Sequence, residues 1–380
     1  MTVLVVNAGS SSLKVAVFDD NLTERLSGRV TEIGSLAARV EAGPLQGART
    51  VPDHAAALAL VFEAMEEAGL PVASLTAAAH RVVHGGARLA APCRLTEAVV
   101  AEVEACIPLA PLHNPANLTA IRALARLAPH LPQYASFDTA FHATMPEVEI
   151  RYALPPEAEA LGLRRYGFHG ISYASIVRKV QENALLAFPK RLLAFHLGNG
   201  ASACAILEGR SVATTMGYSP LDGLTMGTRT GSIDGNAVLR LAEVHGVTGA
   251  GRILNRESGL LGLGGASDMR ALRKAGTPEA RFALDHFCHW AIRHAGGLIA
   301  AMGGLDAVVF TGGIGENDAG IRAGILRGLR FAGAEFDESA NAAGRPDLHP
   351  PGARVAIWIV PCEEERQIAM EAMQLRSGGA

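Results

Sequence analysis

The chain has 380 residues, of which 49% are hydrophobic, and its formal net charge at pH 7 is -3. This length predicts about two domains, and the hydrophobic content is enough for two sizeable cores. Because both signs of charge are scattered along the chain without a basic cluster, we expect no nucleic-acid partner.

The cysteines and the charge-free stretches exclude two further classes. There are five cysteines without a C-x-x-C pair, which predicts neither a disulfide framework nor a thiolate metal site. One long stretch without Asp, Glu, Lys or Arg, residues 192–207, contains Gly-Asn-Gly and is shorter than the roughly 20 apolar residues of a membrane helix. We therefore expect a cytoplasmic protein with no membrane segment.

The chain opens with a predicted hairpin. Residues 2–6 predict a strand, residues 7–12 a turn of small residues, and residues 13–18 a returning strand with Lys14 at its start. Lys14 is one of only four lysines, so its place at this turn suggests a function, although a solvated lysine at a strand end is the alternative.

Further short strands or edges are predicted over residues 25–40 and 46–51, and a helix over residues 54–69. Residues 76–83 predict a strand that ends in Arg-Val-Val-His-Gly-Gly, and its alternation places Arg81 and Val83 on one face. An arginine beside a Gly-Gly strand end can meet an anion; the alternative is a surface arginine at a sheet edge.

Predicted helices over residues 96–106 and 116–127 flank a proline-bounded loop, residues 109–115. A buried strand, residues 134–137, then delivers Asp138. A carboxylate at a strand end of an α/β protein commonly faces a ligand crevice, and helix capping is the alternative. Residues 145–163 resemble a crossover between lobes.

The second half begins with His169 in a turn before a predicted helix, residues 173–184. There it could donate to a phosphate, although a lone histidine is more often structural. Two strands then meet at Gly198-Asn199-Gly200, whose N–H groups could cradle anionic oxygens; an ordinary Asn-Gly hairpin is the alternative. Because the chain opens the same way, we infer an internal duplication and a ligand cleft between two lobes.

The remaining segments support a nucleotide site. Residues 214–234 form a long loop rich in Gly, Thr and Ser, typical of a functional loop, and residues 258–265 interrupt the helices that follow. The helix predicted over residues 279–302 places Phe282, His286, Trp290 and Leu298 on a core stripe. Strand 307–311, glycine turn 312–317 and helix 319–329 form a nucleotide-binding pattern, weak by itself. A strand over residues 355–360 and an amphipathic helix end the chain.

The ordered motifs resemble those of the acetate kinase family over essentially the whole chain. They are Asn7–Lys14, His80–Gly86, Leu112–Pro115, Phe137–His142, Tyr166–Gly170, His196–Ser202, Met226–Arg229 and Gly313–Asn317. The chain departs from the family pattern at Ile171, Tyr173, Ser232, Gly235 and Glu363. The resemblance implies an α/β fold of two duplicated ribonuclease-H-like lobes, of the actin and Hsp70 ATPase type. The expected lobes are residues 1–145 and 146–364, with helix 365–380 packing back on the first.

The resemblance also implies an ATP-dependent, Mg²⁺-dependent and reversible phosphorylation of a short-chain carboxylate, acetate and also propionate, in a homodimer. Mn²⁺ could replace Mg²⁺. The implied catalytic residues are Arg81, Asp138, His169, Asn199 and Arg229, and Arg81, Val83, Leu112 and Pro220 bind the acid. The nucleotide is assigned to Ser10, Ser12, Lys14, His196, Gly198, Asn199, Gly200, Asp268, Met269, Arg270, Gly313, Ile314, Gly315 and Asn317, and the metal to Asn7 and Glu364.

Three alternatives remain at this point. One is a kinase that prefers propionate or butyrate, and another is a phosphotransferase that uses pyrophosphate. The third is a nucleotide-gated binding protein of the actin or Hsp70 type, because a fold does not fix a function.

Overall fold

The computed structural model describes residues 2–183 and 188–378. Met1, the last residue of the helix predicted over 173–184 and the last two residues of the helix expected over 365–380 lie outside the described residues. The chain divides into two compact units. Unit 1 comprises Met1–Phe141, Gly170–Ala174 and Glu363–Ala380, and unit 2 comprises His142–His169 and Ser175–Cys362.

These units differ from the expected lobes at their borders. The first segment of unit 1 ends at Phe141, four residues before the expected limit at 145. Unit 1 also includes the segment Gly170–Ala174, and its last segment begins at Glu363. The reason is local packing. The backbone N–H of Gly170 donates to the Asp138 carbonyl at 2.8 Å, and the side chain of Ile171 joins the apolar cluster on the first sheet.

Unit 1 is built on a sheet in the order β5-β4-β3-β2-β1-β6-β8-β7. Its strands are β1 (Val3–Ala8), β2 (Ser12–Phe18), β3 (Glu24–Thr31), β4 (Ala38–Ala42), β5 (Leu45–Arg49), β6 (Ala77–Val82), β7 (Cys93–Arg94) and β8 (Gln133–Phe137). β1 pairs antiparallel with β2 and parallel with β6, which pairs parallel with β8. The side chains of Asn7, Arg81 and Asp138 therefore come from neighbouring strand ends.

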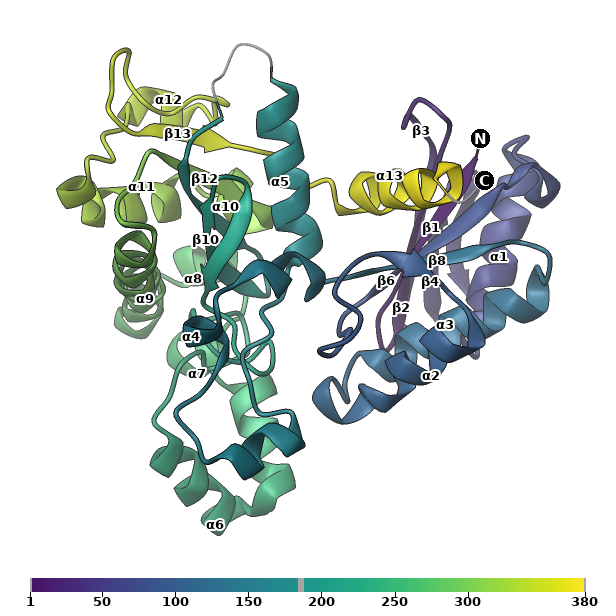
Figure 1. Cartoon of the computed structure of the whole chain (residues 1–380), viewed down its shortest axis with the longest axis horizontal. Helices are drawn as coiled ribbons and strands as arrows, with labels where there is room; N and C mark the ends of the chain where they lie inside the picture. Colours follow the sequence, from purple (N-terminus) through teal and green to yellow (C-terminus); the bar gives the residue numbers. More distant parts are fainter. Residues whose placement is uncertain (1, 184–187, 379–380) are drawn as a thin grey trace. The chain divides into compact units, whose positions relative to one another are not determined.

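Alternation along β1 builds two cores. Leu4 and Val6 pack with residues of α1 (His54–Glu67) and α3 (Asn114–Leu127), and α2 (Glu97–Ala105) adds a smaller cluster beside α3. Val3 and Val5 face the other way and pack with Ile368, Ala369 and Ala372 of α13 (Glu364–Ser377). Figure 1 shows α13 (yellow) against this sheet, with α1 and α3 on its other side.

Unit 2 repeats the core of this topology. Its sheet has the order β11-β10-β9-β12-β13, formed by β9 (Arg191–Leu197), β10 (Ala201–Leu207), β11 (Arg210–Thr214), β12 (Ala307–Thr311) and β13 (Ala356–Ile359). Three antiparallel strands precede two parallel ones, as in β3-β2-β1-β6-β8 of unit 1. The predicted duplication of a ribonuclease-H-like lobe is confirmed, and so is the hairpin turn at residues 198–200, because Leu197 pairs with Ala201.

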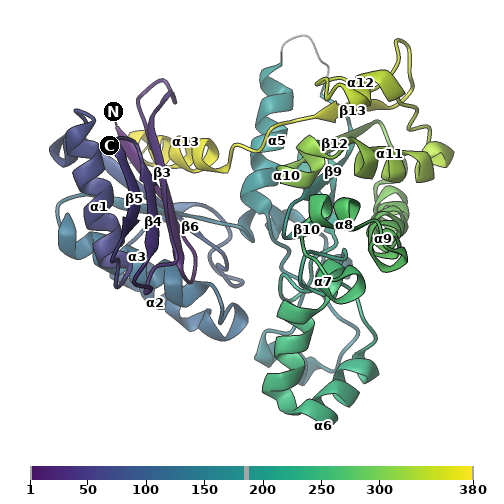
Figure 2. The ribbon, with the colours of Figure 1, turned by 180° about the vertical axis from the view of Figure 1, so that it is seen from behind.

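The helices of unit 2 pack around this sheet. They are α4 (Glu147–Ile150), α6 (Gly235–Arg252), α7 (Gly259–Gly264), α8 (Met269–Ala275), α9 (Pro278–Met302), α10 (Gly312–Asn317), α11 (Ala319–Gly328) and α12 (Glu338–Ala342), and α5 (Gly170–Glu182) enters from unit 1. α9 and α11 lie side by side in Figures 1 and 2. No helix in the described ranges has both the length and the apolar character needed to cross a membrane.

Short helical turns complete the described elements. They are 3₁₀ turns at Val72–Ser74, Ile107–Leu109, Ala140–Thr144, Pro156–Leu161 and Arg330–Ala332, and a π-helical turn at Ile253–Glu257.

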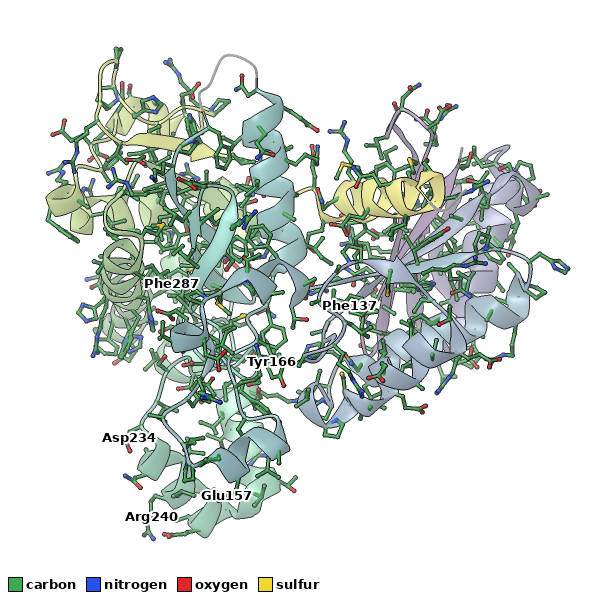
Figure 3. The ribbon with its side chains drawn as sticks, viewed as in Figure 1. Phe137, Glu157, Tyr166, Asp234, Arg240 and Phe287 are labelled. Carbon is green, nitrogen blue, oxygen red and sulfur yellow. The ribbon has the colours of Figure 1, made fainter. Side chains whose placement is uncertain are left out.

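Three expectations for unit 2 are wrong. The predicted glycine turn 312–317 is the short helix α10. The stretch 258–265 is not a simple interruption, because Gly259–Gly264 forms α7 against α9. The core stripe of α9 also differs from the predicted one. Of the four predicted residues only Leu298 is buried, His286 and Trp290 are half-buried, and Phe282 is 57% exposed. The rest of the buried face consists mainly of Ala280, Ala283, Ala291 and Ala295 with Phe287, which Figure 3 labels.

Candidate active site

A bidentate ion pair between Arg81 and Asp138 lies at the strand ends of unit 1. Arg81 donates from Nε to Asp138 Oδ1 at 3.0 Å and from Nη2 to Asp138 Oδ2 at 2.6 Å. Its Nη1 donates to the Oδ1 of Asn7 at 3.3 Å. Because Asp138 is only 2% exposed while Arg81 is 23% exposed at its side chain, the pair fixes a guanidinium whose edge still reaches solvent.

Negative charge exceeds positive charge around this pair. Lys14 Nζ lies 2.6 Å from Glu365 Oε1, and Glu364 interacts electrostatically with both Arg81 and Asp138. Burial raises the pKa of Glu364 against the influence of Arg81, and Asp138 and Glu365 raise it further. Three carboxylates, Asp138, Glu364 and Glu365, thus accompany two cations, Arg81 and Lys14.

The same charges act on Arg81. Burial alone would lower the pKa of this guanidinium, but the charges of Asp138 and Glu364 raise it above the ordinary value. Arg81 therefore stays charged at every pH at which the protein is folded. A permanently charged guanidinium with free donor capacity suits a carboxylate or phosphate ligand.

Two buried asparagines fix the backbone beside Arg81. Asn117 accepts from the N–H of Val83 at 3.1 Å and donates to the carbonyl of Ala8 at 2.8 Å, so it joins the ends of β6 and β1. Asn114 accepts from the N–H of His84 at 3.2 Å and donates to the His84 carbonyl at 3.0 Å. Sequence reasoning assigned neither asparagine a role, although Asn114 stands in a quoted motif.

The predicted acid-binding residues are divided between the units. Val83 is buried and Leu112 is 47% exposed in unit 1, whereas Pro220 belongs to unit 2. Ser10 and Ser12 lie in the first hairpin turn, where the N–H of Gly9 donates to the Ser12 carbonyl at 2.8 Å. His54, which was not predicted as a site residue, contacts the Gly9 carbonyl through Nε2 at 2.8 Å and helps to hold this turn.

In unit 2 the central hairpin turn lies against His169 and Arg229. A Cβ on Gly200 would lie 3.0 Å from Arg229 Nη2 and 3.3 Å from His169 Nε2, so glycine allows the backbone to approach both side chains. Arg229 Nη1 donates to the Pro220 carbonyl at 2.5 Å. The turn amides, one guanidinium and one imidazole are thus gathered in one place.

The ring of His169 is fixed in its orientation. Its Nδ1 lies 2.9 Å from Ser202 Oγ, and the ring stacks on that of His196 with centroids 4.2 Å apart. His169 has a left-handed backbone (φ 59°) directly before α5, which turns its side chain out of the helix. Ser202 is a positioning partner that sequence reasoning did not assign, although it ends a quoted motif.

A cavity of about 520 Å³ in unit 2 begins at the same turn. It is lined by Gly198, Asn199, Ser267, Asp268, Met269, Arg270, Gly313, Ile314, Asn317 and Asp318. Gly315 does not line it and instead packs near Phe310 and Leu197. Asp268 caps α8, and its hydrogen bond from Arg270 lowers the pKa of this carboxyl to about 2.

The chain is similar to known enzyme sequences over nearly its whole length. The sequence model described as the acetokinase family matches residues 2–370. The chain is 44% identical to the acetate kinase of Streptomyces griseus, over 98% of this chain and 96% of the relative. It is 45% identical to the acetate kinase of Deinococcus radiodurans, over 100% and 99% of the two chains.

Solved structures agree with these relatives. The acetate kinase of Porphyromonas gingivalis superposes with a TM-score of 0.91 at 35% identity, covering 99% of each chain. A propionate kinase from Francisella tularensis superposes with a TM-score of 0.92 at 33% identity, covering 97% of this chain and 98% of that one.

Proposed function

This chain belongs to the acetokinase (acetate kinase) family of enzymes, and we propose that it transfers the γ-phosphoryl group of ATP to acetate, reversibly and with Mg²⁺. A carboxylate oxygen forms a bond to the γ-phosphorus, the bond from that phosphorus to the β,γ-bridging oxygen breaks, and acetyl phosphate and ADP are released. Because a carboxyl group titrates near pH 4, acetate arrives ionised and the forward reaction needs no general base.

One observation carries the proposal. The 520 Å³ cavity is continuous with the glycine turn that also contacts His169 and Arg229. Its volume lies within the roughly 300–1,000 Å³ of ordinary small-molecule sites. An adenosine group in the cavity would place its phosphates along Gly198 and Asn199, toward the imidazole and the guanidinium. An open cavity at this place favours ATP over pyrophosphate as the phosphoryl donor.

The cationic side chains would perform most of the catalysis. Phosphoryl transfer relies on positioning and on stabilising charge around three equatorial oxygens. We assign Arg229 and His169 to the transferring group and Arg81 to the carboxylate. Asp138 holds Arg81 in a fixed orientation and does not need to exchange a proton.

The unbalanced carboxylates of unit 1 fit a divalent cation. Mg²⁺ prefers carboxylate and carbonyl oxygens, and Asn7 and Glu364 offer both kinds close to Arg81. These two residues would hold the ion, with Asp138 helping to orient its waters, and Mn²⁺ could take the same place. The ion would supply charge neutralisation for the phosphates.

Val83 supports a preference for short acids. It stands two residues after Arg81 and is buried, with its backbone held by Asn117. A pocket distinguishes one methylene by about 1 to 3 kcal/mol, so we expect acetate and propionate to react and butyrate to react poorly. Val83→Ala should improve kcat/KM for propionate and butyrate relative to acetate.

The direct test is a hydroxamate assay for acyl phosphate. The purified chain is given Mg²⁺, either ATP or pyrophosphate, and acetate, propionate or butyrate. Formation of hydroxamate from acetate with ATP supports the proposal. If hydroxamate forms with pyrophosphate and not with ATP, pyrophosphate is the phosphoryl donor. Absence of acyl phosphate with every pair would contradict the proposed reaction.

We also propose a homodimer, as the family resemblance implies, formed through the surface of α6 rather than α9. Most apolar side chains of α9 are buried within unit 2, but Leu239, Val244 and Val247 of α6 are all more than half exposed. Figure 3 shows α6 with Asp234 and Arg240 labelled at its start and along its first turns. A second copy would cover these apolar side chains.

A further inference from the structure

Unit 1 contains an apolar cavity of about 210 Å³ that none of the proposed catalytic or ligand-binding residues lines. Its walls include Ala90, Phe137, Phe141, Ile171 and Ala174, and Phe137 is labelled in Figure 3. The cavity is smaller than the roughly 300–1,000 Å³ that hold drug-sized ligands. It has room for a compact molecule with one ring or a short alkyl chain.

One carboxylate, Glu371 of α13, also lines this cavity. Its Oε2 accepts from Ser136 Oγ at 2.5 Å and its Oε1 accepts from Gln367 Nε2 at 2.9 Å. Within residues 2–183 and 188–378, no Lys, Arg or His forms an ion pair with Glu371. Burial raises the pKa of Glu371, and the hydrogen bonds from Ser136 and Gln367 oppose this rise.

We propose that this cavity binds a small organic ammonium ion, with the ammonium group on Glu371 and the apolar body against Phe137 and Phe141. Glu371 is only partly exposed, and a carboxylate shielded from water without a counter-ion is costly, so a cationic ligand would supply the missing charge. A metal ion does not fit, because a single carboxylate in an apolar wall offers too few oxygen ligands.

All the residues that line the cavity belong to unit 1, and two of them stand at the ends of its chain segments. Phe141 is the last residue of the first segment of unit 1, and Ala174 ends the segment that begins at Gly170. Phe137 directly precedes Asp138, and Ile171 is two residues after His169. A bound ammonium ion would restrain these segments, so its binding should change turnover as well as stability. The binding itself does not depend on the proposed kinase reaction.

The test uses the full chain and three probes of one shape: benzylammonium, benzyl alcohol and benzoate. Binding is measured by calorimetry on the parent, Glu371→Gln, and Ala174→Phe, which fills the cavity. Glu338→Gln, at an exposed carboxylate of unit 2, is the matched control. We expect saturable binding of benzylammonium, weakened at least tenfold by Glu371→Gln, abolished by Ala174→Phe and unchanged by the control.

Two results would overturn the proposal. Equal affinity for benzyl alcohol and benzylammonium would show that Glu371 is simply protonated and that no cation is recognised. Unchanged benzylammonium affinity in both cavity variants, or no saturable binding, would show that the cavity is not the site. If Glu371→Gln does not fold, the comparison of probes and the Ala174→Phe variant still decide.

Discussion

Both carboxylate oxygens of Asp138 accept hydrogen bonds from the guanidinium of Arg81, at 3.0 Å from Nε and 2.6 Å from Nη2. A lysine could keep the charge but not the two-pronged geometry. We therefore predict that Arg81→Lys lowers kcat/KM for acetate by about 10²- to 10³-fold, the range seen when one preorganised donor is lost. Initial rates over a range of acetate concentrations measure this effect.

The matched control for Arg81→Lys is Arg29→Lys. Arg29 donates from Nε to Glu41 at 2.6 Å, but both side chains of this pair are exposed. Replacing Arg29 by lysine should leave kcat/KM for acetate within about twofold of the parent value, because exposed ion pairs contribute little. If Arg81→Lys, like Arg29→Lys, stays within about twofold of the parent in kcat/KM, Arg81 acts through its charge alone.

Asn117 should position the site without touching the substrates. In Asn117→Asp the Ala8 carbonyl loses its buried donor, which should lower the free energy of unfolding by about 1–3 kcal/mol. We also expect KM for acetate to rise more than KM for ATP, because Val83 is the other partner of Asn117. Urea unfolding and steady-state kinetics test both effects. Asn21→Asp, at an exposed residue of unit 1, should change neither.

Three buried histidines should make the protein acid-sensitive. Burial lowers the pKa of His80, His84 and His142 to about 4, below the ordinary 6.5 that an unfolded chain retains. Between these values the unfolded chain binds more protons, so the free energy of unfolding falls as pH drops from 6.5 and levels off below 4.

The histidine prediction is tested by urea unfolding at several pH values. His80→Gln keeps an amide that can hydrogen-bond Gln133 but cannot titrate, so the pH dependence of stability should become shallower. His130→Gln, at an exposed position, should leave that dependence as in the parent. Parallel curves for the parent and His80→Gln would refute the assignment.

Gly313 should control nucleotide binding. It lines the 520 Å³ cavity, and a Cβ at this position would have no atom within 4 Å. A larger residue at position 313 can therefore extend its side chain into the cavity. We predict that Gly313→Phe raises KM for ATP at least tenfold while KM for acetate changes little. Gly235→Ala is the control, since its Cβ also meets nothing and it lies outside the cavity. An unchanged KM for ATP would place adenosine elsewhere.

The dimer surface can be assigned by placing charge on two helices. Val247 is 83% exposed on α6 and Phe282 is 57% exposed on α9. We expect Val247→Asp to shift the sedimentation coefficient from dimer to monomer, and Phe282→Asp to leave a dimer. The reverse result would assign the interface to α9 instead of α6, and a monomeric parent would contradict the proposed dimer.

Local patterns in the sequence were enough to predict the central turn and most strands, but not β7 or β11. β12 has the predicted bounds, and Gly198-Asn199-Gly200 forms the predicted turn, because an apolar run followed by glycine is a local signal. The same signal failed at residues 258–265. There Gly264 lets α7 approach α9, since a Cβ would lie 2.9 Å from that of Ala283, and this contact outweighs the poor helix propensity of glycine.

The errors on α9 and on the positioning residues have different causes. The aromatic stripe of α9 was mistaken for its core, whereas the buried face is formed by alanines that fit a close helix contact. Asn117 forms hydrogen bonds with Val83 and Ala8, which are 34 and 109 positions away in the sequence. No local sequence pattern predicts bonds over such separations. The site could therefore be predicted as a list of motifs but not as a hydrogen-bonded arrangement.

The return of α13 to unit 1 affects how the protein is synthesised. Ile368 and Ala372 complete the apolar face of Val3 and Val5, but unit 2 is translated between Phe141 and Glu363. At the usual 5–20 residues per second, that interval lasts about 10 to 45 s. During this time one face of the first sheet is uncovered on the ribosome, so unit 2 can fold first and a chaperone can bind the waiting face.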